Sequence, residues 1–357
     1  MKRTITNLLL GAACGGTFQA IACTGIALTA ADGGYVQART IEWALGALQS
    51  EYVIIPRGEE LQSYTPTGTN GLRFTAKYGV VGLTVVMKDF IAEGINEAGL
   101  SAGLFFFPRY GGYETYDPAQ NDRTLADLQV TAWMLSQCAT IDEVKAAIGS
   151  VRVVGLERTS VIHWRLGEPS GRQAVLEIVG GVPHFYENEV GVLTNAPGFE
   201  WQLTNLNNYV NLYPGSAPAQ KLSGLTLQPI GGNSGFLGIP GDATPPSRFV
   251  RAAFYRATAP QRATAFDTVL QCFHLLNNFD IPIGIEHPAG ETPDIPSATQ
   301  WTSAIDLTGR KVYYKTAYNS TIRCIDLTEI DFAKVKYHSR PLDKVQTQPV
   351  EKIAVLQ

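Results

Sequence analysis

The chain carries a cysteine directly after a sequence typical of an export signal. Two positive residues and an apolar run at 8–13 precede Ala20-Ile21-Ala22, which is an A-x-A site for a signal peptidase. We therefore expect residues 1–22 to be a signal peptide, removed on export to the periplasm or the medium. Cleavage after Ala22 makes Cys23 the first residue, which then carries a thiol and a free α-amino group, a nucleophile and a base.

A terminal cysteine of this kind has a defined chemistry. An α-amino group has an unperturbed pKa of about 7.7 to 8.0 and a thiol one of about 8.5, so a proton can pass between them near neutral pH. A peptide nitrogen is not basic, so such a hydrolase is inactive until it is trimmed. Its natural reaction is acyl transfer from an amide through a thioester, which also needs a nearby cation and donors for the oxyanion.

The segment after Cys23 supplies a candidate cation and a candidate acceptor. Asp32-Gly33 predicts a two-residue hairpin turn, in which Glu42 lies opposite Cys23 and can accept a hydrogen bond from the α-amino group. Arg39 is the candidate cation. In a regular strand Arg39 and Glu42 point to opposite faces, unless a bulge re-aims one of them. The alternative is that Arg39 and Glu42 form a solvated cross-strand pair with no catalytic role.

The rest of the chain alternates between sheet and helix patterns. Runs of β-branched and aromatic residues predict strands at 24–30, 35–43, 52–55, 78–87, 91–107, 160–166, 173–179, 184–194, 300–307, 312–318 and 321–327. Helical spacing predicts helices at 124–139, 141–148, 247–255 and 264–277, and the Gly/Pro-rich stretch 214–241 predicts a long ordered loop. These blocks predict an α+β architecture of two antiparallel sheets with helices outside, in one domain over 23–357.

Composition excludes several classes of function. With 45% hydrophobic residues, 17% charged residues and a formal net charge of −4, the chain gives no sign of nucleic-acid binding. After the signal, no apolar run reaches the roughly 18 residues that a membrane helix needs. Cys138, Cys272 and Cys324 lie in apolar runs that predict small buried side chains, and the five histidines form no ligand-spaced cluster. We therefore expect no membrane span, no metal and no cofactor.

Several blocks, taken in order, resemble the choloylglycine hydrolase family, which contains conjugated bile salt hydrolases and penicillin V acylases. These blocks are Cys23-Thr24-Gly25, Arg39 sixteen residues later, and the segments 191–197, 201–206, 238–242 and 244–249. The similarity extends from Cys23 to about Leu327. It implies an N-terminal nucleophile (Ntn) hydrolase with a four-layer αββα sandwich, a small-molecule amide substrate, and a homo-oligomer that is usually a tetramer.

The resemblance also implies roles for individual residues. Cys23 is the nucleophile with its own amine as base, Arg39 steadies the thiolate, and Asn195 donates to the oxyanion from its side chain. Arg248 matches the family's second active-site arginine. Read by chemistry alone, Asn195 is a turn residue and Arg248 is a salt-bridge partner at a helix end.

Two positions depart from the family pattern. Glu42 stands where the family usually has aspartate, so its carboxylate is one methylene longer. In 102–108, Phe105 replaces the usual asparagine or tyrosine and one extra residue precedes Pro108. A phenylalanine side chain cannot donate, so a second oxyanion donor from this segment must be a backbone N–H, of Phe105 or, given the extra residue, of Phe106. The aromatic residues Phe105, Phe106 and Phe107 are either core residues or the lining of an apolar acyl pocket.

The leading hypothesis is hydrolysis of conjugated bile salts to a bile acid and glycine or taurine. Penicillin V or another N-acyl amide is the alternative within the same class of enzyme. A different class follows if Ala22-Cys23 is a lipoprotein signal, because Cys23 would then be lipidated and the chain would be a membrane-tethered binding protein. Leucine usually stands three residues before a lipidated cysteine, where this chain has Ala20.

Overall fold

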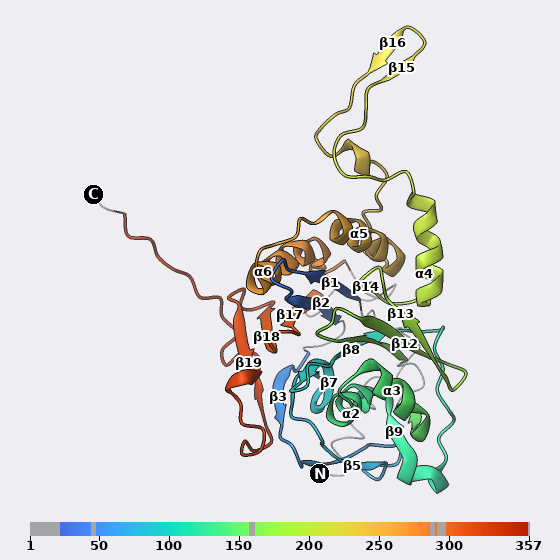
Figure 1. Cartoon of the computed structure of the whole chain (residues 1–357), viewed down its shortest axis with the longest axis vertical. Coiled ribbons are helices and arrows are strands. Elements are labelled where there is room, and N and C mark those ends of the chain that lie inside the picture. The colour runs from blue at the N-terminus through green and yellow to red at the C-terminus, as the bar shows by residue number, and fades with distance from the viewer. Residues whose placement is uncertain (1–21, 44–47, 157–160, 286–289, 291–297, 356–357) are drawn as a thin grey trace.

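Two antiparallel sheets lie face to face in the computed structural model, which describes residues 22–43, 48–156, 161–285, 290 and 298–355. The six-stranded sheet has the order β14-β1-β2-β17-β18-β19, and the eight-stranded sheet has the order β13-β12-β11-β8-β7-β6-β3-β20. Helices α5 and α6 cover the outer face of the first sheet, and α2 and α3 lie on the outer side of the second (Figure 1). The prediction of a four-layer αββα sandwich is confirmed.

The strands of the six-stranded sheet are β1 (Cys23–Thr29), β2 (Tyr35–Trp43), β14 (Val192–Leu193), β17 (Ala298–Asp306), β18 (Lys311–Thr316) and β19 (Arg323–Asp326). The strands of the eight-stranded sheet are β3 (Glu51–Ile55), β6 (Val80–Val85), β7 (Met87–Asn96), β8 (Ser101–Phe106), β11 (Ile162–Gly167), β12 (Gln173–Val179), β13 (Val182–Glu187) and β20 (His338–Pro341). The helices are α2 (Val130–Gln137), α3 (Ile141–Ala147), α4 (Phe199–Leu206), α5 (Pro245–Thr258) and α6 (Ala265–Leu276).

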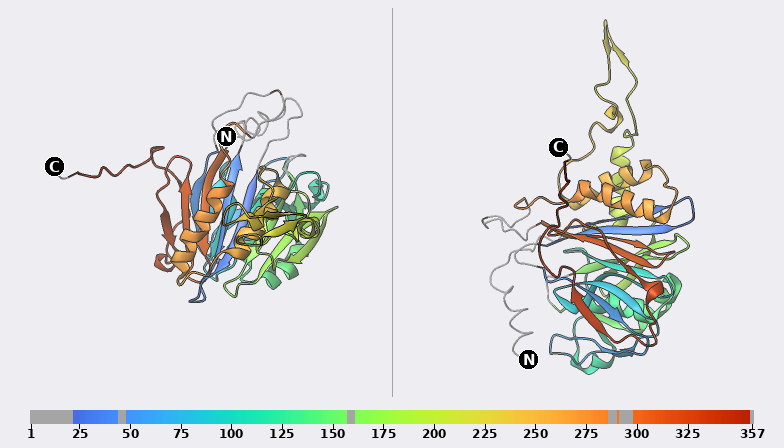
Figure 2. Two further views of the ribbon diagram at one scale, coloured as in Figure 1. Left: turned by 90° about the horizontal axis from the view of Figure 1, so that it is seen from above. Right: turned by 90° about the vertical axis from the view of Figure 1, so that its left-hand side faces the viewer.

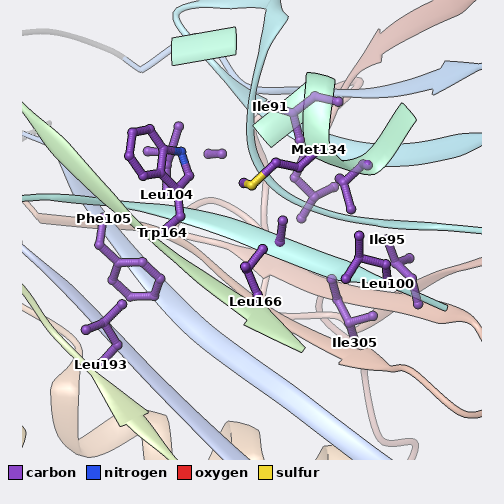
Figure 3. Packing of buried hydrophobic residues seen from close by; sticks show 14 of the residues in the cluster. Ile91, Ile95, Leu100, Leu104, Phe105, Met134, Trp164, Leu166, Leu193 and Ile305 are labelled. Atoms are coloured by element: carbon purple, nitrogen blue, oxygen red, sulfur yellow. The ribbon is translucent and has the colours of Figure 1, made fainter. Parts of the chain in front are cut away.

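The central strands are buried on both faces, because each sheet lies between its partner sheet and a helical layer. All six residues of β6 and of β8 are buried, which explains why these strands are almost continuously apolar. Figure 3 shows part of this core, which runs from Met134 on α2 and Ile91 on β7 to Leu193 on β14. The core therefore fills both the space between the sheets and the space under the helices.

The predicted register of the first hairpin is wrong by one residue. Cys23 pairs with Ile41, not with Glu42, because the loop has three residues instead of two. Ala30 N–H donates to Gly34 O over 2.8 Å, and Gly33 has a φ of 86°. A turn followed by one residue in the left-handed region is the usual three-residue hairpin loop.

The observed register decides which side chains of β1 and β2 lie on the same face of the sheet, because residues that pair across two strands point to the same face. With Cys23 opposite Ile41 and Gly25 opposite Arg39, the side chains of Cys23 and Arg39 share the face toward the eight-stranded sheet. No bulge between them is required. Glu42 takes the other face.

Three other predictions need correction in detail. Cys324, predicted to be buried, is exposed on β19 at the edge of the six-stranded sheet. The predicted helix at 124–139 begins later, because its first residues form β9 (Thr124–Ala126), which pairs in parallel with β10 (Arg152–Val154). The predicted loop at 214–241 contains a hairpin of β15 (Gln220–Leu222) and β16 (Leu225–Leu227), which projects away from both sheets (Figures 1 and 2). A further small hairpin pairs β4 (Glu60–Gln62) with β5 (Arg73–Thr75).

The predicted signal peptide, residues 1–22, lies outside the described residues except for Ala22. Within the described part of the chain, every helix is too short or too polar to cross a membrane.

Candidate active site

Cys23 begins β1, and 1% of its surface is exposed. Its backbone N–H, still part of the peptide bond with Ala22, donates to Asn195 Oδ1 over 2.9 Å. Asn195 follows β14, the neighbour of β1 in the six-stranded sheet. The nitrogen that cleavage after Ala22 would free as an α-amino group therefore lies beside the amide side chain that the sequence predicted for the site.

Arg39 lies between the two sheets and is completely buried. Its guanidinium stacks on the Phe105 ring at 4.1 Å, and Nη1 donates to the carbonyl oxygens of Leu104 and Ala92, to the latter over 3.2 Å. Among the described residues, Arg39 Nη2 has no hydrogen-bond acceptor. Because an unsatisfied buried donor is costly, this nitrogen is suited to an anion that forms during the reaction.

Arg248, on the first turns of α5, connects three parts of the site. Its Nη2 donates to Asn195 Oδ1 over 2.8 Å, and its Nη1 donates to Thr24 Oγ1 over 2.9 Å and to Cys23 O. Asn195 Nδ2 in turn donates to Phe106 O over 2.9 Å, which leaves its second hydrogen for another acceptor. Arg248 therefore fixes both the first residue of β1 and the orientation of the Asn195 amide.

The backbone of β8 supplies a donor at Phe106, one of the two predicted positions. Phe107 N–H donates to Val161 O over 2.7 Å, so the alternation along the strand turns the Phe106 N–H away from β11. That N–H reaches the Cys23 thiol, where its hydrogen bond lowers the thiol pKa. The geometry favours Phe106 over Phe105 as the backbone donor.

The thiol is buried among charges of both signs. Burial is the largest effect and raises the pKa of Cys23 above its usual range, and the negative charge of Glu42 raises it further. The guanidiniums of Arg39 and Arg248 lower the pKa, but the net direction is upward. With the Ala22-Cys23 peptide bond intact, the thiol is therefore held in its neutral form.

This balance predicts how Cys23 reacts with iodoacetamide in the unprocessed chain. The midpoint of alkylation against pH should lie above that of a free cysteine, because only the thiolate reacts. Glu42→Gln should lower the midpoint, since it removes a negative charge that disfavours the thiolate. Mass spectrometry of the Cys23 peptide measures both midpoints, and an unchanged midpoint in Glu42→Gln would contradict this electrostatic description.

Glu42 is buried on the opposite face of β2 from Arg39, and its Oε1 accepts a hydrogen bond from Thr299 Oγ1 over 3.0 Å. Its backbone N–H donates to Ala22 O over 3.0 Å. Glu42 is thus next to the Ala22-Cys23 junction despite the corrected register. A hydrogen bond from the free α-amino group to its carboxylate stays a prediction.

The burial of Phe105, Phe106 and Phe107 separates the two readings of this segment, core residues or the lining of a substrate pocket. Phe105 and Phe107 are 0% and 1% exposed, and their rings pack on Arg39 and on His163. Phe106 is 9% exposed. Phe105 and Phe107 are therefore core residues behind the site, and substrate contact is retained as a prediction for Phe106 alone.

Sequence reasoning missed the buried charges behind Arg39. Glu93 Oε1 accepts from Arg165 Nη2 over 2.8 Å, and Glu93 Oε2 lies 3.6 Å from Arg39 Nη1. Two guanidiniums thus share one carboxylate, which leaves positive charge for a thiolate to balance. The available signal was a charged residue, Glu93 or Arg165, within the buried and otherwise mostly apolar part of β7 and of β11. A second buried pair, His163 and Glu177, was missed for the same reason.

Glycines make room for this network, and one of them gives a stability prediction. A Cβ on Gly103 would clash with Glu93 Oε2, so Gly103→Ala displaces the carboxylate that Arg165 needs. We expect Gly103→Ala to lower the free energy of unfolding by about 1–3 kcal/mol, the usual cost of overpacking. Gly149→Ala is the control, since a Cβ there meets nothing within 4 Å. Urea unfolding compares the two variants, and equal stabilities would contradict the prediction.

Comparison with known proteins identifies relatives along nearly the whole chain. The model of the linear amide C–N hydrolases, choloylglycine hydrolase family, matches residues 23–340. A bile salt hydrolase/transferase from Clostridium perfringens is 31% identical over 314 residues, which cover 86% of this chain and 93% of the relative. A penicillin V acylase from Pectobacterium atrosepticum is 28% identical over 367 residues, which cover 93% of this chain and 88% of the relative.

The fold has a matching solved structure. The crystal structure of a mutant conjugated bile acid hydrolase from Clostridium perfringens superposes with a TM-score of 0.80 and 27% sequence identity. The match covers 93% of this chain and all of the other. The similarity therefore includes both sheets and the helices outside them.

Proposed function

The chain belongs to the choloylglycine hydrolase family of linear amide C–N hydrolases, and from this membership we propose that it cleaves glycine- or taurine-conjugated bile salts through a thioester on Cys23. One observation carries the proposal. The thiol, the buried guanidinium of Arg39 and the Asn195 amide meet at the Ala22-Cys23 junction, where removal of Met1 to Ala22 creates the amine.

The first half of the reaction forms the thioester. The α-amino group of Cys23 takes the thiol proton, and Sγ attacks the carbonyl carbon of the substrate amide. The oxyanion accepts hydrogen bonds from the free hydrogen of Asn195 Nδ2 and from Phe106 N–H. When the C–N bond breaks, the α-ammonium gives its proton to the leaving nitrogen, and glycine or taurine departs as the amine.

The second half releases the acid. The α-amino group takes a proton from water, and the hydroxide attacks the thioester carbonyl against the same donors. The C–S bond breaks, the sulfur recovers the proton from the α-ammonium, and the bile acid leaves. Arg39 stabilises the sulfur anion when the amine has taken the thiol proton and again when the C–S bond breaks, because its Nη2 can donate a hydrogen bond to such a charge.

Export and processing are part of the proposal. The signal at 1–22 directs the chain to the periplasm or the medium, and residues 23–357 form one Ntn-hydrolase domain. Intact mass of the exported protein tests this step. A mass that begins at an unmodified Cys23 supports the hydrolase, whereas added lipid at Cys23 would support the tethered binding protein and exclude a thioester mechanism.

The substrate is tested by parallel hydrolysis of glycocholate, taurocholate and penicillin V by the processed protein. Support for bile salts comes from the 31% identity to the bile salt hydrolase/transferase of Clostridium perfringens. Penicillin V is the second candidate, because the similarity to the penicillin V acylase of Pectobacterium atrosepticum covers 93% of this chain. A higher kcat/KM for penicillin V than for both bile salts would overturn the assignment to bile salts.

A homo-oligomer, with four subunits as the expected number, completes the proposal. Its support is the arm at residues 210–240, which projects from the sheets (Figure 1). This arm exposes several apolar side chains. Ile230 is 94% exposed, and Leu222 and Leu225 at the β15–β16 hairpin are exposed as well. Such residues are costly in water unless another surface covers them. Analytical ultracentrifugation should show the oligomer for the native chain and smaller species for Leu222→Ser/Leu225→Ser. A monomeric native chain would contradict it.

A further inference from the structure

A buried pair of titratable residues lies beside the site and has no part in the steps above. His163 on β11 and Glu177 on β12 are 0% and 3% exposed, and Nδ1 of His163 is 3.2 Å from Oε1 of Glu177. Burying two such groups is expensive unless their hydrogen bonds are satisfied. Their other contacts therefore indicate what the pair does.

Both residues hold the segment that carries Asn195, one at each end. His163 Nε2 lies 3.2 Å from the carbonyl oxygen of Thr194, the residue before Asn195. Glu177 Oε1 accepts from the backbone N–H of Phe199 over 2.8 Å, at the first residue of α4. The four residues between these two contacts, 195–198, include the proposed oxyanion donor. The pair thus clamps a short turn on both sides.

The same imidazole also contacts the strand that carries the second donor. The His163 ring stacks on the Phe107 ring, with centroids 4.4 Å apart and planes 4° apart. Phe107 is next to Phe106, whose N–H reaches the thiol and whose carbonyl accepts from Asn195 Nδ2 over 2.9 Å. One side chain therefore touches the neighbours of both proposed donors.

The hydrogen-bonding roles are consistent with a firm clamp. Thr194 O can only accept, so Nε2 of His163 carries a hydrogen and donates to it. Glu177 Oε1 lies at the other ring nitrogen and also accepts from Phe199 N–H. Both ends of the turn are therefore held by the same pair of side chains.

We propose that His163 and Glu177 are positioning residues that hold Asn195 and Phe106 at the separation and angle that the oxyanion requires. The inference rests on the proposed function, since it assumes that these two groups bind the oxyanion. The pair does not touch the substrate. Its loss should lower kcat with little change in KM, because donors aimed at the oxyanion matter most in the transition state.

Two variants of His163 separate the hydrogen bond from the packing. His163→Phe keeps an aromatic ring against Phe107 but removes the donor to Thr194, and His163→Gln keeps a side-chain N–H donor but removes the ring. We expect His163→Phe to lower kcat by about 10- to 100-fold with KM within about threefold, since a displacement of about 1 Å can cost 100-fold. His163→Gln should lose less. The opposite order would show that the ring packing on Phe107 outweighs the hydrogen bond to Thr194, and would overturn the proposed positioning of Asn195.

A double-mutant cycle with Asn195→Ala tests whether the pair acts through Asn195. Asn195→Ala alone should lower kcat by about 10²- to 10³-fold, the usual cost of one oxyanion donor. In that background His163→Phe should have an effect of less than about threefold, because its target is already absent. An equal factor in both backgrounds would overturn the inference.

The outcomes also distinguish this inference from the proposed function. A native protein that does not hydrolyse the amide panel, or an Asn195→Ala variant with native kcat, would contradict the function itself. If His163→Phe does not fold, Glu177→Gln and Glu177→Leu give the same comparison, because only glutamine keeps an oxygen for Phe199 N–H. Glu177→Leu should then lose more kcat than Glu177→Gln, and equal values would overturn the inference.

Discussion

Cys23→Ala should lower kcat/KM for amide hydrolysis by about 10⁴-fold or more, since the loss of a catalytic nucleophile can cost about 10⁶-fold in kcat. The variant should still fold, because the change removes one buried atom from the end of β1 and leaves the backbone bonds to Asn195 and Arg248 in place. Steady-state kinetics on the processed variant measures the effect, and circular dichroism checks the fold.

The matched control is Cys272→Ala, since Cys272 is also a free and fully buried cysteine, on α6. It should lose some stability, as expected for a small core cavity, but retain kcat and KM. If Cys23→Ala turns over at more than about a hundredth of the native rate, the sulfur is not the nucleophile.

Arg39→Met should be the second most damaging change, with kcat/KM reduced by about 10²- to 10³-fold, comparable to the loss of a preorganised charge-stabilising donor. Arg39 lowers the pKa of the Cys23 thiol, so its removal should shift the pH dependence of Cys23 alkylation upward. Methionine fills much of the same space against Phe105 but brings no charge. Stability should also fall, because the carbonyls of Ala92 and Leu104 lose their donor.

Arg165→Met is the control that separates the effect on the Cys23 thiol from the effect on stability. Arg165 is equally buried, lies 5.6 Å from the same Phe105 ring and pairs with Glu93 at 2.8 Å. Its guanidinium donates to the carbonyl oxygens of Ile26 on β1 and Ala38 on β2. These two residues pair with each other at a point three residues along β1 from Cys23. Both variants should unfold at lower urea concentrations, but Arg39→Met should shift the alkylation midpoint further. Equal shifts would contradict a specific role for Arg39.

Much of the fold can be predicted from the sequence, because the spacing of apolar residues and the residues that favour turns are local features. Two antiparallel sheets with helices outside follow from blocks of strand and helix patterns, whereas the four-layer αββα order came from the family resemblance. Thr264, the predicted first residue of its helix, caps α6. The β1–β2 register was missed because Asp32-Gly33 fits either a two- or a three-residue loop. The structure resolves this through the Ala30–Gly34 hydrogen bond, and the resolved register places Arg39 on the face of Cys23.

Some residues of the candidate site can be predicted from local sequence patterns and others cannot. Cys23 is identified by the cleavage motif before it, and Arg39 by its place in the next strand. His163 and Glu177 are only buried polar residues in apolar strands until the fold brings Thr194 and Phe199 beside them. Contacts of this kind join segments that are distant in sequence, and no local pattern specifies them.

The central claim is that a free α-amino group at Cys23 makes the enzyme active. The most direct measurement uses one protein sample, in which a recognition site for a specific protease that leaves no residue behind stands immediately before Cys23. Amide hydrolysis and intact mass are followed before and after cleavage. The account predicts negligible turnover while Cys23 remains in a peptide bond, because a peptide nitrogen cannot act as the base, and turnover that rises in proportion to the chains that begin at Cys23. Equal activity before and after cleavage would contradict it.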